Sequence, residues 1–562
     1  MDLAVAYQGR SAVVATPAGL AVSLAPNLRR DRVAFDAALR HPLRFREAIG
    51  ALHDVVIGDL RRGPRDRSAR NAHRRSEADR EERLRRQVTA QARAAHAEAN
   101  PELALLEGEF RQKRAQYWKA RRAYSDHLSR NNPRLWRLLM PCDPVVTVAP
   151  DVLFFECFSA DESSYGCLTV DREGFGPARD VAEGTTNVDY SWALYEHFQE
   201  LRSYRETRFL IDPGGFEVAT TGQGEGYREE KIPLPPSWLR GFLQLQSAMA
   251  LPTRRVRVGR EGLYNILAFL KRNRAAKSPR ALRFELEPGR PPSVVLEPWE
   301  KRIALHDRPY DGPKSEVIRT WGRDRLLVLA RLLPLLDDAE VDLLGTGLPS
   351  FWSVRMGEMR LLLGLSGWTA NDWTGASALA QLAPPADPDP LAVARVAASF
   401  GDAPAQSLDR IVARTGDPAP VVAAALNTLA LMGQVIYDLH AGAYRWRQVM
   451  PVALSAELIG PEDPETVAAR SMTATQGIRV TKDETRPDGL RVLEGLDYHR
   501  PISLLLDADG RMVGGKCSCS HHFTGGLRRG PCRHLQALRL KASTPADAAP
   551  AGLAAWFASL WN

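Results

Sequence analysis

The sequence predicts an α+β protein of several domains, and three observations lead to this prediction. In the middle of the chain, segments that alternate apolar and polar residues are interleaved with helical patterns. The stretch APPADPDP, residues 383–390, interrupts these patterns and indicates a linker. Near the C-terminus, CSCSHHFTGGLRRGPCRHLQ (517–536) holds three of the six cysteines and three of the twelve histidines. This cluster indicates a small metal-binding domain.

Length and composition place the chain among ordinary globular proteins. It has 562 residues, 44% of them hydrophobic and 25% charged, and a chain of this length forms about three or four domains. The beginning, MDLAVAYQGR, lacks the features of a signal peptide, and no apolar run approaches the roughly 18 residues of a membrane span. The most apolar stretch, residues 326–336, is predicted to be a buried helix. We therefore expect a cytoplasmic protein without membrane contact, in which clustered cysteines bind metal.

The net charge of +8 and the pI near 9.2 leave two interpretations open. A basic chain can bind nucleic acid. However, arginine greatly outnumbers lysine, and alanine and leucine are abundant, as GC-rich coding produces without selection for DNA binding. Charge alone does not decide between them.

Residues 1–140 are predicted to begin with short strands and to continue as long charged helices. From Phe35 to Leu60, apolar residues recur at helical spacing, with a break expected at Pro42. Residues 61–86 are rich in arginine and almost free of apolar residues. They are interpreted as a solvated helix or a disordered arm, with contact to an acidic partner as the alternative.

Residues 141–382 are predicted to form one α+β domain or two closely associated ones. Strand-like segments such as VVTVAPDVLFFECFS are followed by helical patterns such as REGLYNILAFLKRNRA. The acids Glu156, Asp161, Glu162 and Asp171 lie close together in the first strands, yet acids at turns are usually solvated. Because no catalytic set of side chains is evident, we predict that the protein is not an enzyme.

Residues 391–450 contain three helical patterns followed by two strands, and this order resembles a winged-helix domain. The resemblance implies that the third helix reads DNA. That helix has no Lys or Arg, and only Asn427 and Thr428 suit a base contact. The wing adds only Arg445 and Arg447 as phosphate contacts. A structural or protein-binding domain is therefore favoured over a DNA reader.

The cysteine cluster has the spacing of a structural zinc site. Cys517-x-Cys519 is followed after twelve residues by Cys532-x-His534. Three thiolates and one imidazole complete a tetrahedral shell with no open position, so we predict one structural Zn²⁺ ion. Nearby glycines are expected to permit the tight chain path, and two further histidines are alternative imidazoles. The glycines are Gly514, Gly515, Gly525, Gly526 and Gly530, and the histidines are His521 and His522.

This cluster, with two strand patterns before it and one helical pattern after it, resembles the SWIM zinc finger over residues 470–545. The layout of the whole chain is similar to that of bacterial SWIM-domain proteins encoded beside MoxR-type AAA+ ATPases and von Willebrand factor A (vWA) proteins. The resemblance implies a non-catalytic recognition or adaptor protein, with ATP hydrolysis supplied by such a partner.

The alternative function is nucleic-acid binding through the winged helix and the finger. From 511 to 546 the chain has seven basic residues and no acid, although cations here would also offset the charge of a Cys₃His zinc centre. The candidate phosphate contacts are Lys516, Arg528, Arg529 and Arg533. The tail 546–562 has an apolar helical face, predicted to dock on the finger or, alternatively, in a partner's groove.

Overall fold

The computed structural model describes most of the chain outside a long segment near the N-terminus. Contacts divide the chain into two compact units, residues 1–58 with 142–562, and residues 59–141. The described residues are 3–8, 12–16, 19–24, 32–57, 144–188 without 160, parts of 194–211, 228–275 without 235, 280–305, 308–367, 373, 382, 389–449, 464–507 without 476, and 510–543, with single positions between 109 and 131. Among them, no helix is both long and apolar enough to cross a membrane.

The described positions of the second unit are helical and exposed. The arginine-rich residues 61–86 and the tail 546–562 lie outside the described residues. The helical positions are Glu109, Gln112, Lys113, Gln116, Ala120, His127 and Asn131.

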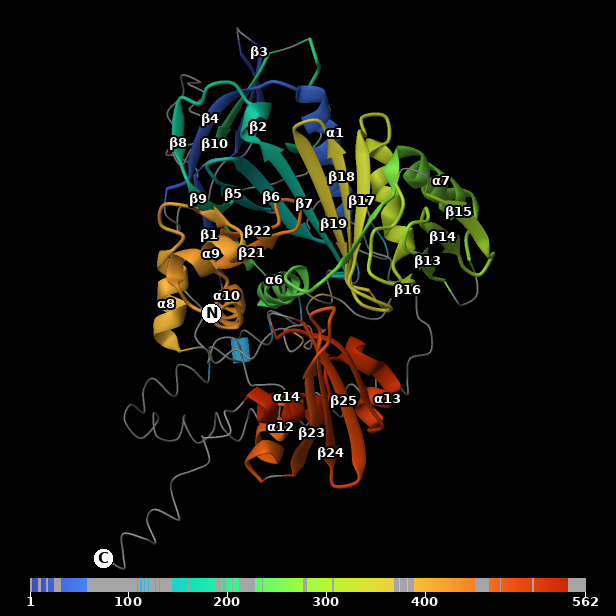
Figure 1. Cartoon of the computed structure of the whole chain (residues 1–562). Coiled ribbons are helices and arrows are strands. Elements are labelled where there is room, and N and C mark those ends of the chain that lie inside the picture. The colour runs from blue at the N-terminus through green and yellow to red at the C-terminus, as the bar shows by residue number, and fades with distance from the viewer. Residues whose placement is uncertain are drawn as a thin grey trace, which may run out of the picture. The chain divides into compact units, whose positions relative to one another are not determined.

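The prediction of a mixed α+β chain is confirmed, and the largest element is an eight-stranded antiparallel sheet (Figure 1). Two of its inner strands, β6 (Val152–Phe158) and β7 (Ser164–Asp171), are buried at almost every position. Helix α1 (Pro42–Val56) packs against both strands. The order is β12 (Arg254–Arg257), β17 (Asp338–Leu343), β18 (Ser350–Met356), β19 (Met359–Leu365), β7, β6, β5 (Val145–Val148), β9 (Gly184–Asn187).

A second, five-stranded sheet joins the N-terminal strands to later residues. Parallel pairing links β10 (Thr207–Ile211) to β3 (Gly19–Leu24), and antiparallel pairing links β10 to β4 (Ala34–Leu39). The first strands therefore share a sheet with residues beyond the predicted division after residue 140. The outer strands are β2 (Ala12–Thr16) and β8 (Asp180–Ala182), and β1 (Leu3–Gln8) pairs with β11 (Arg228–Leu234).

The helix predicted from the spacing of apolar residues between Phe35 and Leu60, with a break at Pro42, is wrong for the residues before Pro42. Residues 34–39 form β4, because they pair with β10 on one side and β8 on the other. The helix begins at Pro42 itself. Proline lacks an N–H group, and the first turn of a helix leaves that group unused, so Pro42 starts the helix instead of breaking it.

The leucine-rich stretch expected to be a buried helix from residue 326 is a 3₁₀ helix, η2 (Arg323–Leu332). Its buried leucines are Leu326, Leu329 and Leu332. A spacing of three residues places all of them on one face of a helix with three residues per turn. The same spacing is compatible with an α-helix, so the sequence pattern did not separate the two.

The rest of this region adds two helices and a four-stranded sheet. Helix α6 (Pro236–Met249) packs against two elements of the next region, α10 (Ala419–Leu431) and β21 (Val435–Asp438). Helix α7 (Gly259–Arg272) packs against η2 and β17. The strand order in this sheet is β15 (Lys301–Ala304), β14 (Ser293–Leu296), β13 (Leu282–Leu286), β16 (Glu316–Thr320). A short 3₁₀ helix, η1 (Arg172–Gly174), follows β7 of the large sheet.

Residues 389–449 form three helices and a three-stranded sheet. Ser407 is the N-cap of α9, because its hydroxyl accepts a hydrogen bond from the Arg410 amide at 3.3 Å. The helices are α8 (Pro390–Ala398), α9 (Leu408–Thr415) and α10 (Ala419–Leu431), and the strand order is β20 (Ala405–Gln406), β22 (Ala443–Trp446), β21 (Val435–Asp438).

Residues 464–543 form a four-stranded antiparallel sheet flanked by helices. The last helix, α14 (Arg533–Ser543), packs against α12 (Pro464–Ala474) and the sheet. The sequence did not indicate α12 or β23. The strands, in both chain and sheet order, are β23 (Ile478–Thr485), β24 (Arg491–Asp497), β25 (Arg500–Leu506) and β26 (Met512–Cys517), followed by α13 (Ser520–Gly525) and η4 (Gly526–Arg529).

Two arginines after β21 connect residues 389–449 to the large sheet. Arg447 donates to both carboxylate oxygens of Glu156, each at 3.0 Å. Each residue is only 1% exposed, and the Tyr165 hydroxyl also donates to Glu156, at 2.6 Å. Arg445 donates to both oxygens of Asp151 at 2.8 Å. The wing arginines that the sequence offered as phosphate contacts are thus buried ion-pair partners of the protein's own acids.

We expect Arg447→Ala to destabilise the protein by about 3–5 kcal/mol, because it leaves the Glu156 carboxylate buried without its counter-charge. Urea unfolding followed by tryptophan fluorescence measures the loss. The control is Arg395→Ala, which removes an exposed ion pair with Asp417 and should leave the midpoint nearly unchanged. Equal midpoints for the two variants would contradict a stabilising role for the buried pair.

Candidate metal centre

The four predicted ligands converge at one end of the C-terminal sheet. Cys517 ends β26, Cys519 caps the start of α13, and Cys532 and His534 lie at the start of α14. One ligand atom from each of the four residues lies within 4.8 Å of the other three. In a tetrahedral site with metal–sulfur bonds of about 2.3 Å, sulfur atoms are about 3.8 Å apart. The cluster therefore fits a single metal ion.

Burial separates this cluster from a chance group of surface side chains. Cys532 is fully buried, Cys519 and His534 are 8% and 7% exposed, and Cys517 is half-buried. The Nδ1 atom of His534 is buried, and no described residue hydrogen-bonds to it. A buried imidazole nitrogen without a partner is costly unless a ligand binds it. Its position in a group of three cysteines is what metal coordination requires.

The other ring nitrogen of His534 supports this assignment. Its Nε2 atom lies 3.3 Å from a carboxylate oxygen of Asp497 and 2.9 Å from a guanidinium nitrogen of Arg500. A guanidinium can only donate, so Nε2 accepts from Arg500 when the ring proton is on Nδ1. When the proton is on Nε2, it is donated to Asp497 and the lone pair of Nδ1 is available to a metal ion. Metal binding at Nδ1 would select this second tautomer, with Asp497 orienting the ring.

The sulfur atoms also receive hydrogen bonds typical of metal-bound thiolates. The backbone N–H of His522 donates to the Cys519 sulfur at 3.4 Å. The backbone of Leu535 hydrogen-bonds to the thiol group of Cys532 and lowers its pKa, although other contributions outweigh this one. Such bonds stabilise the negative charge that a thiolate brings to the site.

The thiols interact strongly with one another. A hydrogen bond with the Cys532 thiol is the largest cause that lowers the pKa of Cys517, to about 3, and burial opposes it. The same hydrogen bond and burial raise the pKa of the Cys532 thiol. A divalent cation would displace the thiol protons at this site, since metal binding requires thiolates.

The glycines near the cluster differ in role. Gly526 and Gly530, with φ of 56° and 87°, turn the chain between the two ligand pairs, as predicted. Gly514 and Gly515 lie within β26 and not in a tight turn, contrary to the expectation from sequence. A Cβ atom at Gly515 would lie 2.9 Å from a methyl carbon of Leu535, so this glycine allows α14 to pack against the strand.

Several of the basic residues in this region have intramolecular partners. Arg533 forms an ion pair with Glu465 of α12 at a shortest distance of 2.5 Å, and Arg511 forms one with Asp507 at 2.7 Å. Arg539 is 5% exposed, and its burial lowers its pKa to about 10. Of the remaining candidate phosphate contacts, Lys516 is exposed, Arg528 is half-buried, and the side chain of Arg529 lies outside the described residues.

The other residues that the sequence singled out are also internal. Asn427 is 7% exposed, and the Thr428 hydroxyl donates to the Ala424 carbonyl at 3.0 Å within α10. Glu156, expected to be solvated, is buried against Arg447. Asp161 accepts hydrogen bonds from Ser159 and Ser163 and forms an ion pair with Arg325 at 3.1 Å.

Sequence reasoning missed Asp497 and Glu465, because each contacts the cluster region only through the fold. Asp497 lies at the end of β24, and the antiparallel pairing of β24 with β25 places it beside Arg500. No spacing rule in the sequence links it to His534.

No protein-family model and no curated protein sequence matches the chain. Among solved structures, the proliferating cellular nuclear antigen of Entamoeba histolytica shows limited similarity. Its TM-score is 0.28 at 9% sequence identity, over 41% of this chain and 90% of that one.

We expect Asp497→Ala to weaken metal binding about 10- to 100-fold, since it removes the acceptor that orients His534. Competition with a chromogenic chelator measures the affinity. Asp483→Ala is the matched control, because this acid of the same sheet pairs with Arg491 at 2.6 Å and belongs to no metal-binding cluster. Identical affinities in both variants would show that Asp497 does not orient the histidine.

Proposed function

We propose that residues 464–543 are a SWIM-type finger built on one structural zinc ion, within a non-catalytic recognition or adaptor protein. One observation carries the proposal: a buried Cys₃His set that supplies four ligand atoms from the end of a strand and the start of a helix. Four protein ligands leave no coordination position for water or substrate. A metal held in this way stabilises a fold and presents a surface.

The zinc ion would supply much of the stability of this small region. Residues 464–543 form a four-stranded sheet with α14 packed across it, and small domains of this kind commonly depend on metal for folding. Cys517, Cys519, Cys532 and His534 would hold the ion, and thiolate ligands favour zinc over magnesium or calcium.

Two exposed aromatic side chains favour a protein partner. Phe523 is 85% exposed and follows His522, whose backbone contacts the Cys519 sulfur. Tyr498 is 83% exposed and follows Asp497. Aromatic residues are enriched at protein interfaces, where they are frequent hot spots. Both belong to segments that the metal centre fixes in place.

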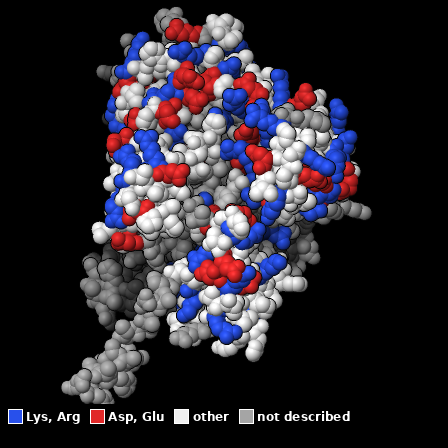
Figure 2. Space-filling view, in the orientation of Figure 1, with Lys and Arg blue, Asp and Glu red and all other residues white. Residues whose placement is uncertain are grey.

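Charge pairing supports a protein partner over nucleic acid. Arg511 and Arg533 are neutralised by acids of the same chain, so fewer cations remain for phosphates than the sequence suggests. On the face shown in Figure 2, basic and acidic side chains are interspersed and do not form one continuous basic area. The helix α10, with Asn427 buried, offers little to a base edge.

The order of elements in residues 389–449 supports a winged-helix assignment. Helix, strand, two helices and two strands follow one another, and the short β20 pairs with β22. Because α10 packs against α6 and α8, we propose that this domain is a structural or protein-binding winged helix.

We expect the protein to contain one zinc ion per chain and Cys519→Ser to lose it. The loss removes roughly 10–16 kcal/mol of metal-binding free energy that would stabilise the folded region. Mass spectrometry of metals in the purified full chain measures the content. His522→Ala is the control, since its ring lies outside the four-residue cluster. Full metal retention in Cys519→Ser would rule out this ligand set.

We expect the full chain to co-purify with a MoxR-type AAA+ ATPase or a vWA protein, the partners that the family resemblance implies. Phe523→Ala should weaken the association at least about tenfold while zinc content stays unchanged. Nuclease treatment should have no effect. If nuclease removes every identified partner, or if a salt-sensitive nucleic-acid shift appears at physiological ionic strength, the adaptor proposal is wrong.

A further inference from the structure

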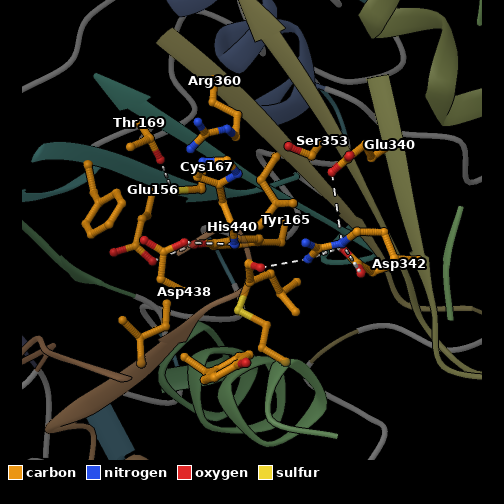
Figure 3. Close-up of a pocket in the computed structure, with 17 residues that line it drawn as sticks. Glu156, Tyr165, Cys167, Thr169, Glu340, Asp342, Ser353, Arg360, Asp438 and His440 are labelled. Carbon is orange, nitrogen blue, oxygen red and sulfur yellow. Dashed lines mark hydrogen bonds and ion pairs between the residues drawn. The ribbon is translucent and has the colours of Figure 1, made fainter. Parts of the chain in front are cut away.

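A pocket lies between the large sheet and the turn after β21, away from the metal centre in sequence and in ligand type. Its walls come from β7, β12, β17, β18 and β19 on one side, and from residues 436–440 on the other. The cavity volume is about 40 Å³, and the pocket is partly open to solvent. Figure 3 shows charged and apolar side chains converging on it.

The carboxylates that line the pocket are already paired with arginines. Glu156 is held by Arg447, as described above, and Asp438 accepts from the Arg445 Nε atom at 2.8 Å. The remaining two, Asp342 and Glu340, lie 3.0 and 3.9 Å from the Nε atom of Arg255. The same arginine donates to the Leu439 carbonyl at 2.7 Å. Each of these four acids therefore has an arginine beside it, although Asp342 and Glu340 share Arg255, and Arg445 also pairs with Asp151.

Unlike the other charged residues of the pocket, Arg360 has no ion-pair partner among the described residues. It lines the pocket and is 9% exposed, yet no described residue accepts a hydrogen bond from its guanidinium or forms an ion pair with it. Arg360 lies in β19. Its paired residues on the two neighbouring strands are Arg355 of β18 and Thr169 of β7, and neither is an acid. In Figure 3 its side chain extends toward Cys167 and His440, without a dashed line to either.

An unpaired guanidinium that is this deeply buried is energetically costly. Asp171 and Asp438 attract it through space, while burial, the largest cause, lowers the pKa of Arg360. A cation kept in such a position, next to space that a small molecule can enter, is the arrangement expected for the binding of an anion.

His440 provides a second polar group at the same place. Burial, followed by the charge of Arg360, lowers the pKa of His440, so its imidazole is neutral at pH 7. A neutral imidazole offers one N–H donor to an anion without adding charge. Asp438 fixes the backbone here, because it accepts from the amides of His440 and Ala441 at 3.0 and 3.1 Å.

The remaining surfaces indicate the chemistry of the anion. Phe154, Met249 and Leu362 contribute apolar walls, which suit a hydrocarbon body. The four lining carboxylates repel a doubly charged phosphate more strongly than a singly charged carboxylate. The guanidinium of Arg360 can hold a carboxylate with two parallel hydrogen bonds.

We propose that this pocket binds a small monocarboxylate with an apolar body, with Arg360 as its counter-ion and His440 as a second hydrogen-bond donor. The site is separate from the finger, so this proposal does not depend on the proposed zinc-based adaptor function. A recognition protein with such a pocket would respond to a small acid as well as to its partner.

Calorimetric titration of the full chain with hexanoate, acetate and inorganic phosphate tests the proposal. Hexanoate should bind more tightly than acetate, and both more tightly than phosphate. Arg360→Met should weaken hexanoate binding at least about tenfold, the loss expected for hydrogen bonds to a charged group. Arg355→Met is the matched control on the paired position of β18 and should bind like the wild type.

A second variant keeps the test decisive if Arg360→Met fails to fold, as circular dichroism would show. His440→Ala changes an exposed side chain and should weaken hexanoate binding several-fold. The proposal is overturned if the wild type binds neither carboxylate, if phosphate binds more tightly than hexanoate, or if both folded variants bind hexanoate as the wild type does.

Discussion

The pairing of buried arginines with distant carboxylates is the constraint on which the central architecture depends. Arg447 and Glu156 are both removed from water, and each is acceptable there only because the other is present. Since Arg447 follows β22 and Glu156 lies in β6, their ion pair holds residues 389–449 against the large sheet. Arg445 reinforces the same junction through Asp151. The pocket lined by Arg360 exists because this junction brings the turn after β21 over β7 and β19.

The Cys/His cluster likewise consists of buried polar groups that need a partner, here three thiols and one imidazole. The sheet of residues 478–517 and helix α14 bring three sulfurs and one imidazole together, and the Nδ1 atom of His534 is left without a protein partner. The surrounding structure satisfies the other polar groups, from Asp497 at Nε2 to the backbone amide at Cys519. A cation is the missing component that would complete this network. The exposed rings of Phe523 and Tyr498 then stand on segments that the ion would make rigid.

Local patterns in the sequence predicted many of the elements but not all of their types. Alternating residues in VVTVAPDVLFFECFS predicted β5 and β6. Residues 34–39 were misassigned because AFDAAL fits both periodicities, and only the pairing of β4 with β10 and β8 selects the strand. The leucines spaced by three residues in η2 were equally ambiguous. The segments α12 and β23 carry weak periodicity, and their contacts with α14 and β24 define them.

The sequence by itself identified the four residues of the Cys/His cluster, because the members of each pair are separated by a single residue and therefore stay together in any compact fold of this segment. It also determined the alternation of strands and helices, which depends on neighbours a few residues away. Only the tertiary structure decided which charges are available. Arg445, Arg447 and Arg533 look alike in the sequence, but their acids lie 294, 291 and 68 residues away. Arg360 forms no ion pair with a described residue, and its paired neighbours on the adjoining strands are Arg355 and Thr169. Electrostatic pairing acts through space and not along the chain, so whether a cation stabilises the fold or remains for a ligand is fixed only when the sheets assemble.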